Sequence, residues 1–175
     1  MKILNIGSGN KINKKADNLD YINGKGINIV HDLNKFPYPI NDKTYDIITA
    51  YQILDHLDSM RKTFIELHRI LKKGGHIIFT VPHFSSREAS HPDHNCTCST
   101  GIVNYLCLRE FKFNTANDSL DLYKRISIKI KLYHGRHYFS GIIENIINKH
   151  QVLYESTFLN SMFPAHEIKF ILQKK

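Results

Sequence analysis

Two groups of residues in this sequence have the types and the spacing to do chemistry, and the first is a pair of glycines. Gly7 and Gly9 stand in I-G-S-G, directly after a short apolar run. Glycine lets the backbone turn sharply and leaves main-chain N–H groups bare, so a ligand can lie against them. The spacing favours a nucleotide-like ligand, although a tight turn without a ligand explains these residues alone equally well.

The second group is a set of histidines that could act as general bases, because histidine titrates near neutral pH. It comprises His56, His83, His91 and His94. For His56 we favour packing beneath a strand over a catalytic role. His83 and His94 are as well explained by catalysis as by the ordinary polarity of a loop.

The last two of these histidines stand in a segment whose residue types also bind zinc. The segment H-P-D-H-N-C-T-C offers five possible ligands, His91, Asp93, His94, Cys96 and Cys98. Its spacing is too tight for the usual pair of zinc knuckles, and no second cluster in the sequence complements it. We therefore predict no bound metal.

Length and composition indicate one ordinary cytoplasmic domain. The 175 residues can bury a single core, no apolar run could cross a bilayer, and the N-terminus lacks the pattern of a signal peptide. The three cysteines fall in one short region, unlike a disulfide framework. The formal charge of +8 favours anionic partners, but the lysines are spread along the chain, which is more typical of solvated surface than of a nucleic-acid footprint.

Five strands are expected in the first half, each an apolar run bounded by polar or turn-forming residues. We place them at residues 2–6, around Leu19, and at 26–31, 45–50 and 76–81. Asp20 and Asp32 then compete for the role of the acid that binds a ribose in dinucleotide-type folds. Because Pro37 and Pro39 exclude a strand farther on, residues 26–31 are taken as the third strand, which leaves Asp20 as the ribose acid.

Helices should alternate with these strands. Asp58 or Ser59 could cap a helix with one buried face. Residues 72–75, K-K-G-G, should end that helix with cations near its C-terminal dipole and a glycine in the left-handed cap. The first crossover, between Gly9 and Leu19, is too short for a full helix, so its helix is expected to be truncated or absent.

This alternation predicts a mostly parallel sheet whose ligands lie beyond the C-terminal ends of the strands. The residues at such ends are Gly7, Gly9, Asp20, Asp32, Tyr51 and His83. The second half is less regular. We expect a short helix after Ser99, a strand at 125–134 with one face in water, a helix at 139–150 and a last strand at 167–175, with the two late strands forming an antiparallel hairpin.

Aromatic and basic side chains are secondary candidates. Stacking on a base, or a place in an acceptor site, is open to Tyr21, Phe36, Tyr38 and Tyr51. Aromatics at strand ends more often pack in the core. An anionic acceptor could be held by Arg87, Arg109, Lys112, Arg125 or Arg136. Solvated surface charge is the more frequent role for each of them.

Taken in order, the motifs resemble the signatures of class I S-adenosylmethionine-dependent methyltransferases, and they are most similar to small methyltransferase domains of type 11. They read L-N-I-G-S-G-N, N-L-D, V-H-D-L-N-K-F-P-Y-P, Y-D-I-I-T-A-Y-Q-I-L-D-H-L and H-R-I-L-K-K-G-G-H-I-I-F-T-V-P. The resemblance implies an α/β, Rossmann-like fold with a seven-stranded, mostly parallel sheet of order 3-2-1-4-5-7-6 and helices on both faces. Residues 1–175 would form a single domain, with 1–82 as the cofactor-binding half and 83–175 as the acceptor-side half.

The resemblance also implies roles for individual residues. The expected cofactor-binding residues are Gly7, Ser8 and Gly9 at the amino-acid end of S-adenosylmethionine, Asp20 at the ribose, Asp32 and Leu33 at the adenine, and Tyr51. The segment H-P-D-H-N-C-T-C-S is similar to a D-P-x-H-x-x-x-F-S segment of some of these enzymes, which would place Asp93 and His94 over the active site. With His83, these two residues are the catalytic candidates.

The sequence departs from the family's pattern in four places. The first helix is truncated, Asn10 replaces the usual third glycine, Asp55 replaces a glutamate, and no lid segment stands before the first strand. These departures bear on how tightly the cofactor is held.

We therefore expect an enzyme that transfers a methyl group from S-adenosylmethionine to an oxygen or nitrogen of a small-molecule or glycan-like acceptor, without a membrane partner. The positive charge supports methylation of RNA or protein as an alternative. The truncated first helix supports another alternative, an inactive cofactor-binding scaffold. The sequence leaves the acceptor and the oligomeric state open.

Overall fold

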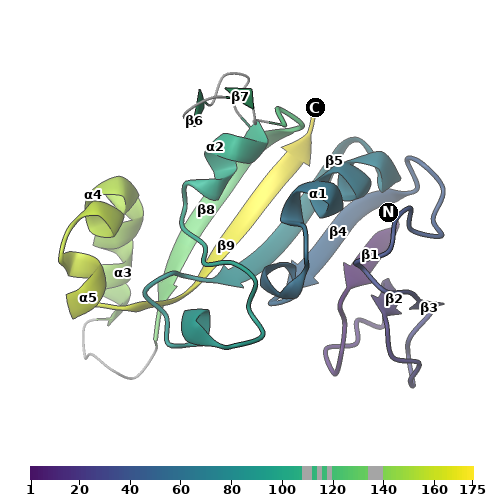
Figure 1. The fold of residues 1–175 in the computed structure, drawn as a ribbon, viewed down its shortest axis with the longest axis horizontal. Coiled ribbons are helices and arrows are strands. Elements are labelled where there is room, and N and C mark those ends of the chain that lie inside the picture. The colour runs from purple at the N-terminus through teal and green to yellow at the C-terminus, as the bar shows by residue number, and fades with distance from the viewer. Residues whose placement is uncertain (108–111, 114–115, 118–119, 134–139) are drawn as a thin grey trace.

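A seven-stranded sheet runs through the molecule (Figure 1), which is known from a computed structural model describing residues 1–107, 112–113, 116–117, 120–133 and 140–175. The strand order is β3-β2-β1-β4-β5-β9-β8, as the resemblance implied. These strands are β1 (Ile3–Ile6), β2 (Asp17–Asp20), β3 (Ile29–Val30), β4 (Tyr45–Tyr51), β5 (Leu71–Pro82), β8 (Tyr123–Leu132) and β9 (Ala165–Lys174). The first five pair in parallel, and β9 runs antiparallel between β5 and β8. A separate two-stranded ribbon pairs β6 (Lys112–Phe113) with β7 (Ala116–Asn117).

The helical segments of the described residues are three to eleven residues long. They are η1 (Leu54–His56), α1 (Met60–Ile70), η2 (Glu88–Ser90), α2 (Ile102–Cys107), α3 (Ser140–Lys149), α4 (Gln151–Ser156) and α5 (Leu159–Met162). Of the two predicted caps for α1, Ser59 is the one used, because its side chain accepts a hydrogen bond from the Lys62 N–H. No described helix is long and apolar enough to cross a membrane.

The end of α1 differs from the prediction. The helix stops at Ile70, and Leu71 is already extended and opposite Tyr45, so residues 72–75 lie within β5 and do not cap the helix. Lys72 pairs with Asp46 of β4 at 2.9 Å, which draws this segment onto the sheet. Gly74 does adopt a positive φ of 73°, as a left-handed residue, but at an irregularity of the strand.

The core lies between the sheet and α1. Phe64 of α1 contacts Phe79 of β5 with ring centroids 5.3 Å apart, and Phe79 stacks on Phe170 of β9 at 4.7 Å. All three rings are fully buried. Truncating a buried phenylalanine to alanine typically costs about 3–5 kcal/mol, so this aromatic row is a main source of the fold's stability.

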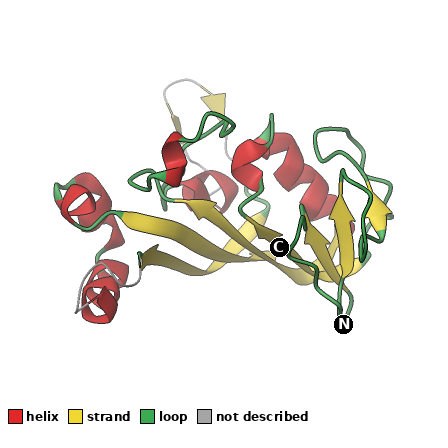
Figure 2. Ribbon diagram, turned by 90° about the horizontal axis from the view of Figure 1, so that it is seen from below, coloured by secondary structure: helices red, strands yellow, loops and turns green. Residues whose placement is uncertain are grey.

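The first crossover contains no helix, in agreement with the sequence. Figure 2 shows α1 and α2 on the same side of the sheet, with no described helix against the opposite face of the central strands. The fold class is thus confirmed, but its helices cover one face and the β8 end rather than both faces. On the uncovered side, Asn5 donates to Asn18 Oδ1 at 3.0 Å and accepts from Thr49 at 3.1 Å. Polar side chains that bond one another replace the apolar contacts that a crossover helix would need.

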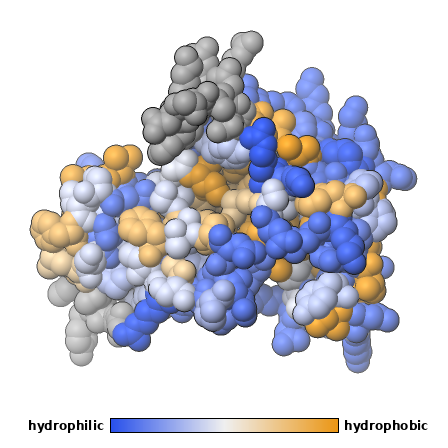
Figure 3. Space-filling model, viewed as in Figure 1, coloured by the Kyte–Doolittle hydropathy of each residue, from blue (hydrophilic) through white to orange (hydrophobic). Residues whose placement is uncertain are grey.

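The other end of the sheet is covered by α3, because β8 is an edge strand with free backbone groups. Asn148 of α3 bonds both the N–H and the carbonyl of Ile130 at 2.8 Å, and Glu144 accepts from the Leu132 N–H at 3.1 Å. The predicted strand and helix are found here, although His134 and Phe139 lie outside the described residues. The surface of this end is apolar (Figure 3), with exposed Ile142, Ile146, Val152, Leu153, Phe158 and Met162.

Candidate active site

A pocket of about 300 Å³ opens at the C-terminal ends of the parallel strands, where the sequence places the ligand. Its lining comprises Gly7, Asp20, Tyr21, His31, Asp32, Leu33, Asn34, Ile53, His56 and Leu57. Residues from the ends of β1, β2 and β3 therefore meet residues from the turn that follows β4. Four of the seven cofactor candidates, Gly7, Asp20, Asp32 and Leu33, line this pocket.

The loop after β1 needs its glycines. Gly7 and Gly9 have φ of 58° and 45°. Residues other than glycine adopt such positive values only at a cost in conformational energy. A Cβ on Gly7 would lie 2.3 Å from Cγ1 of Ile53, whereas a Cβ on Gly9 would meet no atom within 4 Å. Gly9 thus leaves bare main chain beside open space, and the side chain of Ile53 narrows the pocket at Gly7.

Asp20 holds this loop against the end of β2. Its Oδ2 accepts from the Gly9 N–H at 2.8 Å and its Oδ1 accepts from the Ile22 N–H at 3.1 Å. The residue is 7% exposed, so the carboxylate is fixed at the pocket wall. Each carboxylate oxygen has a second lone pair that can accept from a ligand hydroxyl. Asp32, at the neighbouring strand end, accepts from the Asn34 N–H at 3.0 Å.

Two of the cofactor candidates, Ser8 and Tyr51, lie outside the lining of the pocket. Ser8 is buried and its hydroxyl donates to the Leu19 carbonyl at 3.2 Å, so its side chain serves the turn. Tyr51 ends β4 with its side chain outside the lining of the pocket. Cofactor contacts by these two residues stay predictions.

His83 is placed in a buried contact away from the pocket lining. Its Nδ1 accepts from the Ser85 N–H at 3.1 Å, which leaves the proton on Nε2, 3.4 Å from Oε1 of Glu155. Burial would raise the pKa of Glu155, but the proximity of His83 and hydrogen bonds from Thr100 outweigh it and hold the pKa below its ordinary value. Nδ1 of His83 is engaged by Ser85, while its Nε2 lies near Glu155 without a hydrogen bond among the described residues. Because the ring is buried outside the lining of the pocket, its geometry fits positioning α4 better than accepting a proton from an acceptor.

His94 does reach the lip of the pocket, where it meets residues that the sequence did not favour. Its Nε2 lies 3.1 Å from Oδ2 of Asp55, and its ring stands perpendicular to that of His56 at 4.5 Å. Asn95 joins the two loops, because its N–H donates to the Asp55 carbonyl and its side chain to the His56 carbonyl. The third catalytic candidate, Asp93, contributes its carbonyl oxygen to Nδ1 of His56 at 3.1 Å while its carboxylate is exposed.

Comparison with known proteins adds the family. Residues 8–79 match the family model described as a methyltransferase domain. Residues 8–79 thus have the sequence pattern of a methyltransferase domain. This match confirms the resemblance that the motifs carry, and with it the enzyme class, an S-adenosylmethionine-dependent methyltransferase. No curated protein matches the chain.

Solved structures share the fold of this methyltransferase. A SAM-dependent methyltransferase from Archaeoglobus fulgidus is 15% identical with a TM-score of 0.60, and the match covers 99% of this chain and 86% of that one. An S-adenosylmethionine-dependent methyltransferase from Mesorhizobium loti is 11% identical, with a TM-score of 0.58 and coverage of 99% and 90%. The N-methyltransferase NodS from Bradyrhizobium japonicum, solved with S-adenosyl-L-homocysteine, is 12% identical, with a TM-score of 0.56 and coverage of 99% and 77%.

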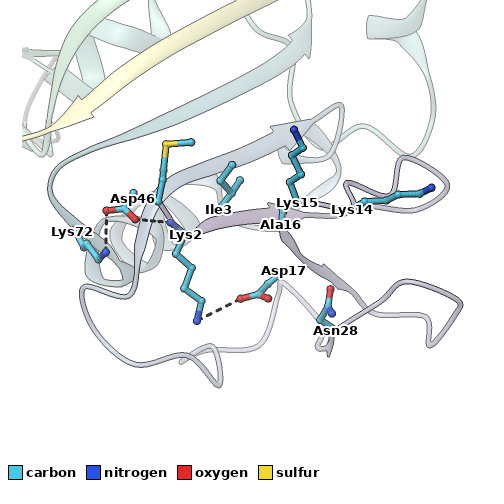
Figure 4. Close-up of a pocket in the computed structure, with 10 residues that line it drawn as sticks. Lys2, Ile3, Lys14, Lys15, Ala16, Asp17, Asn28, Asp46 and Lys72 are labelled. Carbon is cyan, nitrogen blue, oxygen red and sulfur yellow. Dashed lines mark hydrogen bonds and ion pairs between the residues drawn. The ribbon is translucent and has the colours of Figure 1, made fainter.

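A larger pocket of about 510 Å³ lies at the opposite edge of the methyltransferase's parallel strands (Figure 4). Lys2, Lys72, Asp17 and Asp46 line it together with the lysines of the β1–β2 loop. Lys2 pairs with Asp17 at 3.5 Å and Lys72 with Asp46 at 2.9 Å. These charges neutralise one another at the surface, so size alone does not make this pocket the functional one.

The remaining candidates of the methyltransferase contribute little to the site. Tyr21 lines the pocket and is largely exposed, while Tyr38 is buried with its hydroxyl on the Leu33 carbonyl, so it supports the lining from behind. Phe36 stacks on Tyr38 at 5.5 Å. Arg87 and Arg125 are exposed. Arg109, Arg136 and the side chain of Lys112 lie outside the described residues.

Proposed function

We propose that this methyltransferase transfers its methyl group to an oxygen or nitrogen of a small-molecule or glycan-like acceptor. The observation that supports this most is the union of two features at one pocket. A buried carboxylate, Asp20, is clamped beside the bare main chain of Gly9, and a cluster of titratable side chains, Asp55, His56 and His94, stands at the lip.

The residues of the pocket suit S-adenosylmethionine. Asp20 offers acceptor lone pairs for ribose hydroxyls, and the buried Leu33 beside Asp32 offers an apolar contact for a base. The main chain of Gly7 also lines the pocket, although the side chain of Ile53 packs against it. When bound, the cofactor supplies a methyl group on a sulfonium. Most of the rate of such a transfer can come from holding the two partners in line, so positioning is the main task of the chain.

The lip is where an acceptor would lose a proton. His56 lines the pocket and His94 stands directly behind it, both beside the carboxylate of Asp55. The imidazole of His56 would face a hydroxyl or an amine of an acceptor that enters over the pocket.

Surface charge supports the small acceptor over RNA. Several lysines are paired with acids, namely Lys2 with Asp17, Lys35 with Asp32, Lys72 with Asp46, Lys131 with Glu167 and Lys175 with Asp121. A phosphate-binding stripe needs clustered cations that are free to release counterions. These five paired lysines are therefore not free to form such a stripe.

Calorimetry and methyl transfer test the proposal in two stages. We expect heat of binding with S-adenosylhomocysteine, followed by transfer of labelled methyl to a small-molecule or oligosaccharide pool and not to RNA or protein. No heat would favour the inactive scaffold. Label in RNA, with association that weakens steeply with salt, would overturn the acceptor class.

A matched pair of variants assigns the acceptor role. His94→Ala should retain S-adenosylhomocysteine affinity within about twofold and lose about 100-fold in turnover, the upper range for removing a proton-transfer group. His150→Ala, an exposed histidine at the start of α4, is the control and should change neither quantity. Loss of cofactor binding in His94→Ala would instead move this residue into the cofactor site.

A further inference from the structure

Three side chains from two distant segments meet at the lip of the pocket. Asp55 and His56 come from the turn after β4, and His94 comes from the loop after β5. The possible ligand atoms of these three residues all lie within 4.8 Å of one another. Oδ2 of Asp55 is 3.1 Å from Nε2 of His94 and 3.9 Å from Nε2 of His56.

The carboxylate of Asp55 lacks the hydrogen bonds that a buried charge needs. The residue is 1% exposed, and neither of its side-chain oxygens has a hydrogen-bond partner in the described part of the molecule. The contact of Oδ2 with Nε2 of His94 at 3.1 Å is not a hydrogen bond, so proximity alone does not satisfy the charge. Burying an unpaired carboxylate is strongly unfavourable, and such a group ordinarily has a cation beside it.

His56 is already arranged as a ligand. Its Nδ1 lies 3.1 Å from the Asp93 carbonyl, an acceptor only, so the ring proton sits on Nδ1 and the lone pair on Nε2. Histidines that bind metals usually donate their other ring N–H to a carbonyl or carboxylate in this way. The hydrogen bonds of Asn95 to the backbone carbonyls of Asp55 and His56 hold the two loops together behind the cluster.

We propose that Asp55, His56 and His94 bind one divalent transition-metal ion of the Zn²⁺ type. Nitrogen and oxygen ligands of zinc lie about 2.0–2.2 Å from the ion, which puts neighbouring ligand atoms of a tetrahedral site roughly 3.3 Å apart. The pair formed by Asp55 and His94 already has that separation. Nε2 of His56, which lies 3.9 Å from Oδ2 of Asp55, must approach that oxygen by roughly 0.6 Å to reach the same separation. Three protein ligands leave a coordination position open, which is the pattern of catalytic zinc sites.

The site differs from the cluster that the sequence suggested. His91 is exposed and its ring nitrogen accepts from the Asp93 N–H. Cys96 and Cys98 face each other with their sulfur atoms 3.9 Å apart, and Cys98 is buried. The hydrogen bond with the thiol of Cys96, and then burial, raise the pKa of Cys98, which keeps it protonated and a poor ligand. The metal ligands come instead from positions almost forty residues apart in the sequence.

The role of the ion rests on the proposed function. His56 belongs to the lining of the cofactor pocket, so an acceptor hydroxyl in the open position would lie beside the methyl donor. Binding to a divalent cation lowers the pKa of an oxygen ligand, so the hydroxyl proton can leave to solvent. The oxygen then forms a bond to the methyl carbon, while the carbon–sulfur bond breaks and its electron pair stays on sulfur.

Cobalt provides the test, because its absorption reports coordination directly. The full chain, stripped with a chelator, is titrated with Co²⁺ and separately with Zn²⁺ by calorimetry. We expect one equivalent of each, with visible bands of four- or five-coordinate cobalt and no thiolate charge-transfer band. Removing a group that only hydrogen-bonds to a metal ligand typically weakens metal binding ~10–100-fold. Asp55→Asn removes a ligand itself, so we expect it to weaken metal binding by more than that. His91→Ala and Cys96→Ser, from the sequence cluster, are matched controls and should leave the affinity unchanged.

Two further measurements keep the outcomes distinct. If Asp55→Asn fails to fold, His94→Gln replaces it and should show the same loss. Cobalt binding that survives these substitutions, or a thiolate band that Cys96→Ser removes, would overturn the proposal, as would no binding by wild-type protein that still binds S-adenosylhomocysteine. Binding of metal without binding of S-adenosylhomocysteine would leave the metal site standing and defeat the proposed function.

Discussion

The two edges of the parallel strands carry pockets of opposite character. At the N-terminal edge, the larger pocket holds Asp17 and Asp46, each paired with a lysine near the surface. At the C-terminal edge, the smaller pocket is lined by Asp20, whose carboxylate accepts from backbone N–H groups. Asp55 stands next to His56 of that lining, and its carboxylate has no hydrogen bond among the described residues. The comparison teaches that carboxylates left with spare acceptor capacity, and not volume, distinguish the edge that carries the candidate site.

The largest expected effect on cofactor affinity comes from replacing one of the two acids at the ends of β2. Asp20→Ala should weaken binding of S-adenosylhomocysteine about 100-fold, because charged hydrogen bonds to a ribose contribute ~3 kcal/mol together and the loop loses its clamp. Asp17→Ala, at the other end of the same strand, removes the acceptor of the Tyr45 hydroxyl and should leave this affinity unchanged. Calorimetry measures both. Equal losses in the two variants would mean that the edges do not differ.

Alanine variants of the two loop glycines distinguish backbone strain from contact with the ligand. Gly7→Ala should destabilise the fold by roughly 2–4 kcal/mol, since a positive φ and overlap with Ile53 both act against it. Gly9→Ala meets open space, so we expect only about 1 kcal/mol of strain but about tenfold weaker cofactor binding. Urea unfolding and calorimetry give the two quantities. A Gly9→Ala variant that binds the cofactor normally would contradict the approach of ligand to this main chain.

Ile53 tests how far the smaller pocket reaches. Ile53→Ala removes the side chain that packs on Gly7, and we expect affinity for S-adenosylhomocysteine to rise several-fold relative to adenosine, with a stability loss of about 1–2 kcal/mol. Competitive binding of the two ligands gives the ratio. An unchanged ratio would show that the amino-acid end of the cofactor lies elsewhere.

The smallest effect is expected at the N-terminal edge. Hydrogen bonds from the Lys2 N–H and from Lys72 lower the pKa of Asp46 below its ordinary value. A lowered pKa stabilises the fold above the unfolded value of 3.8, and this stability is lost as the pH falls through the folded pKa. Asp46→Asn should therefore lower the melting temperature slightly at pH 7, and this difference should shrink as the pH falls below 3.8. A difference that persists in acid would point to packing rather than charge.

The sequence predicted the parts of the site that strand ends position. Asp20 follows from excluding a strand after residue 32, and the structure places it beside Gly9 as expected. The end of α1 was misjudged because an ion pair to Asp46, formed only in the fold, draws Lys72 onto the sheet. Asp55 as the partner of His94 could not be predicted, since it depends on how the loop after β5 folds back over η1. Neither helical periodicity nor a short motif in the sequence indicates the contact between Asp55 and His94.

Ile53 immediately precedes η1, the short turn that carries Asp55 and His56. If the donor's amino-acid tail displaces Ile53 from Gly7 together with its backbone, the adjoining turn would move and carry two of the three lip residues with it. Binding of the methyl donor would then change the arrangement of the lip residues that the acceptor contacts. Compulsory ordered kinetics, with the donor bound first, are the expected behaviour of an enzyme built in this way.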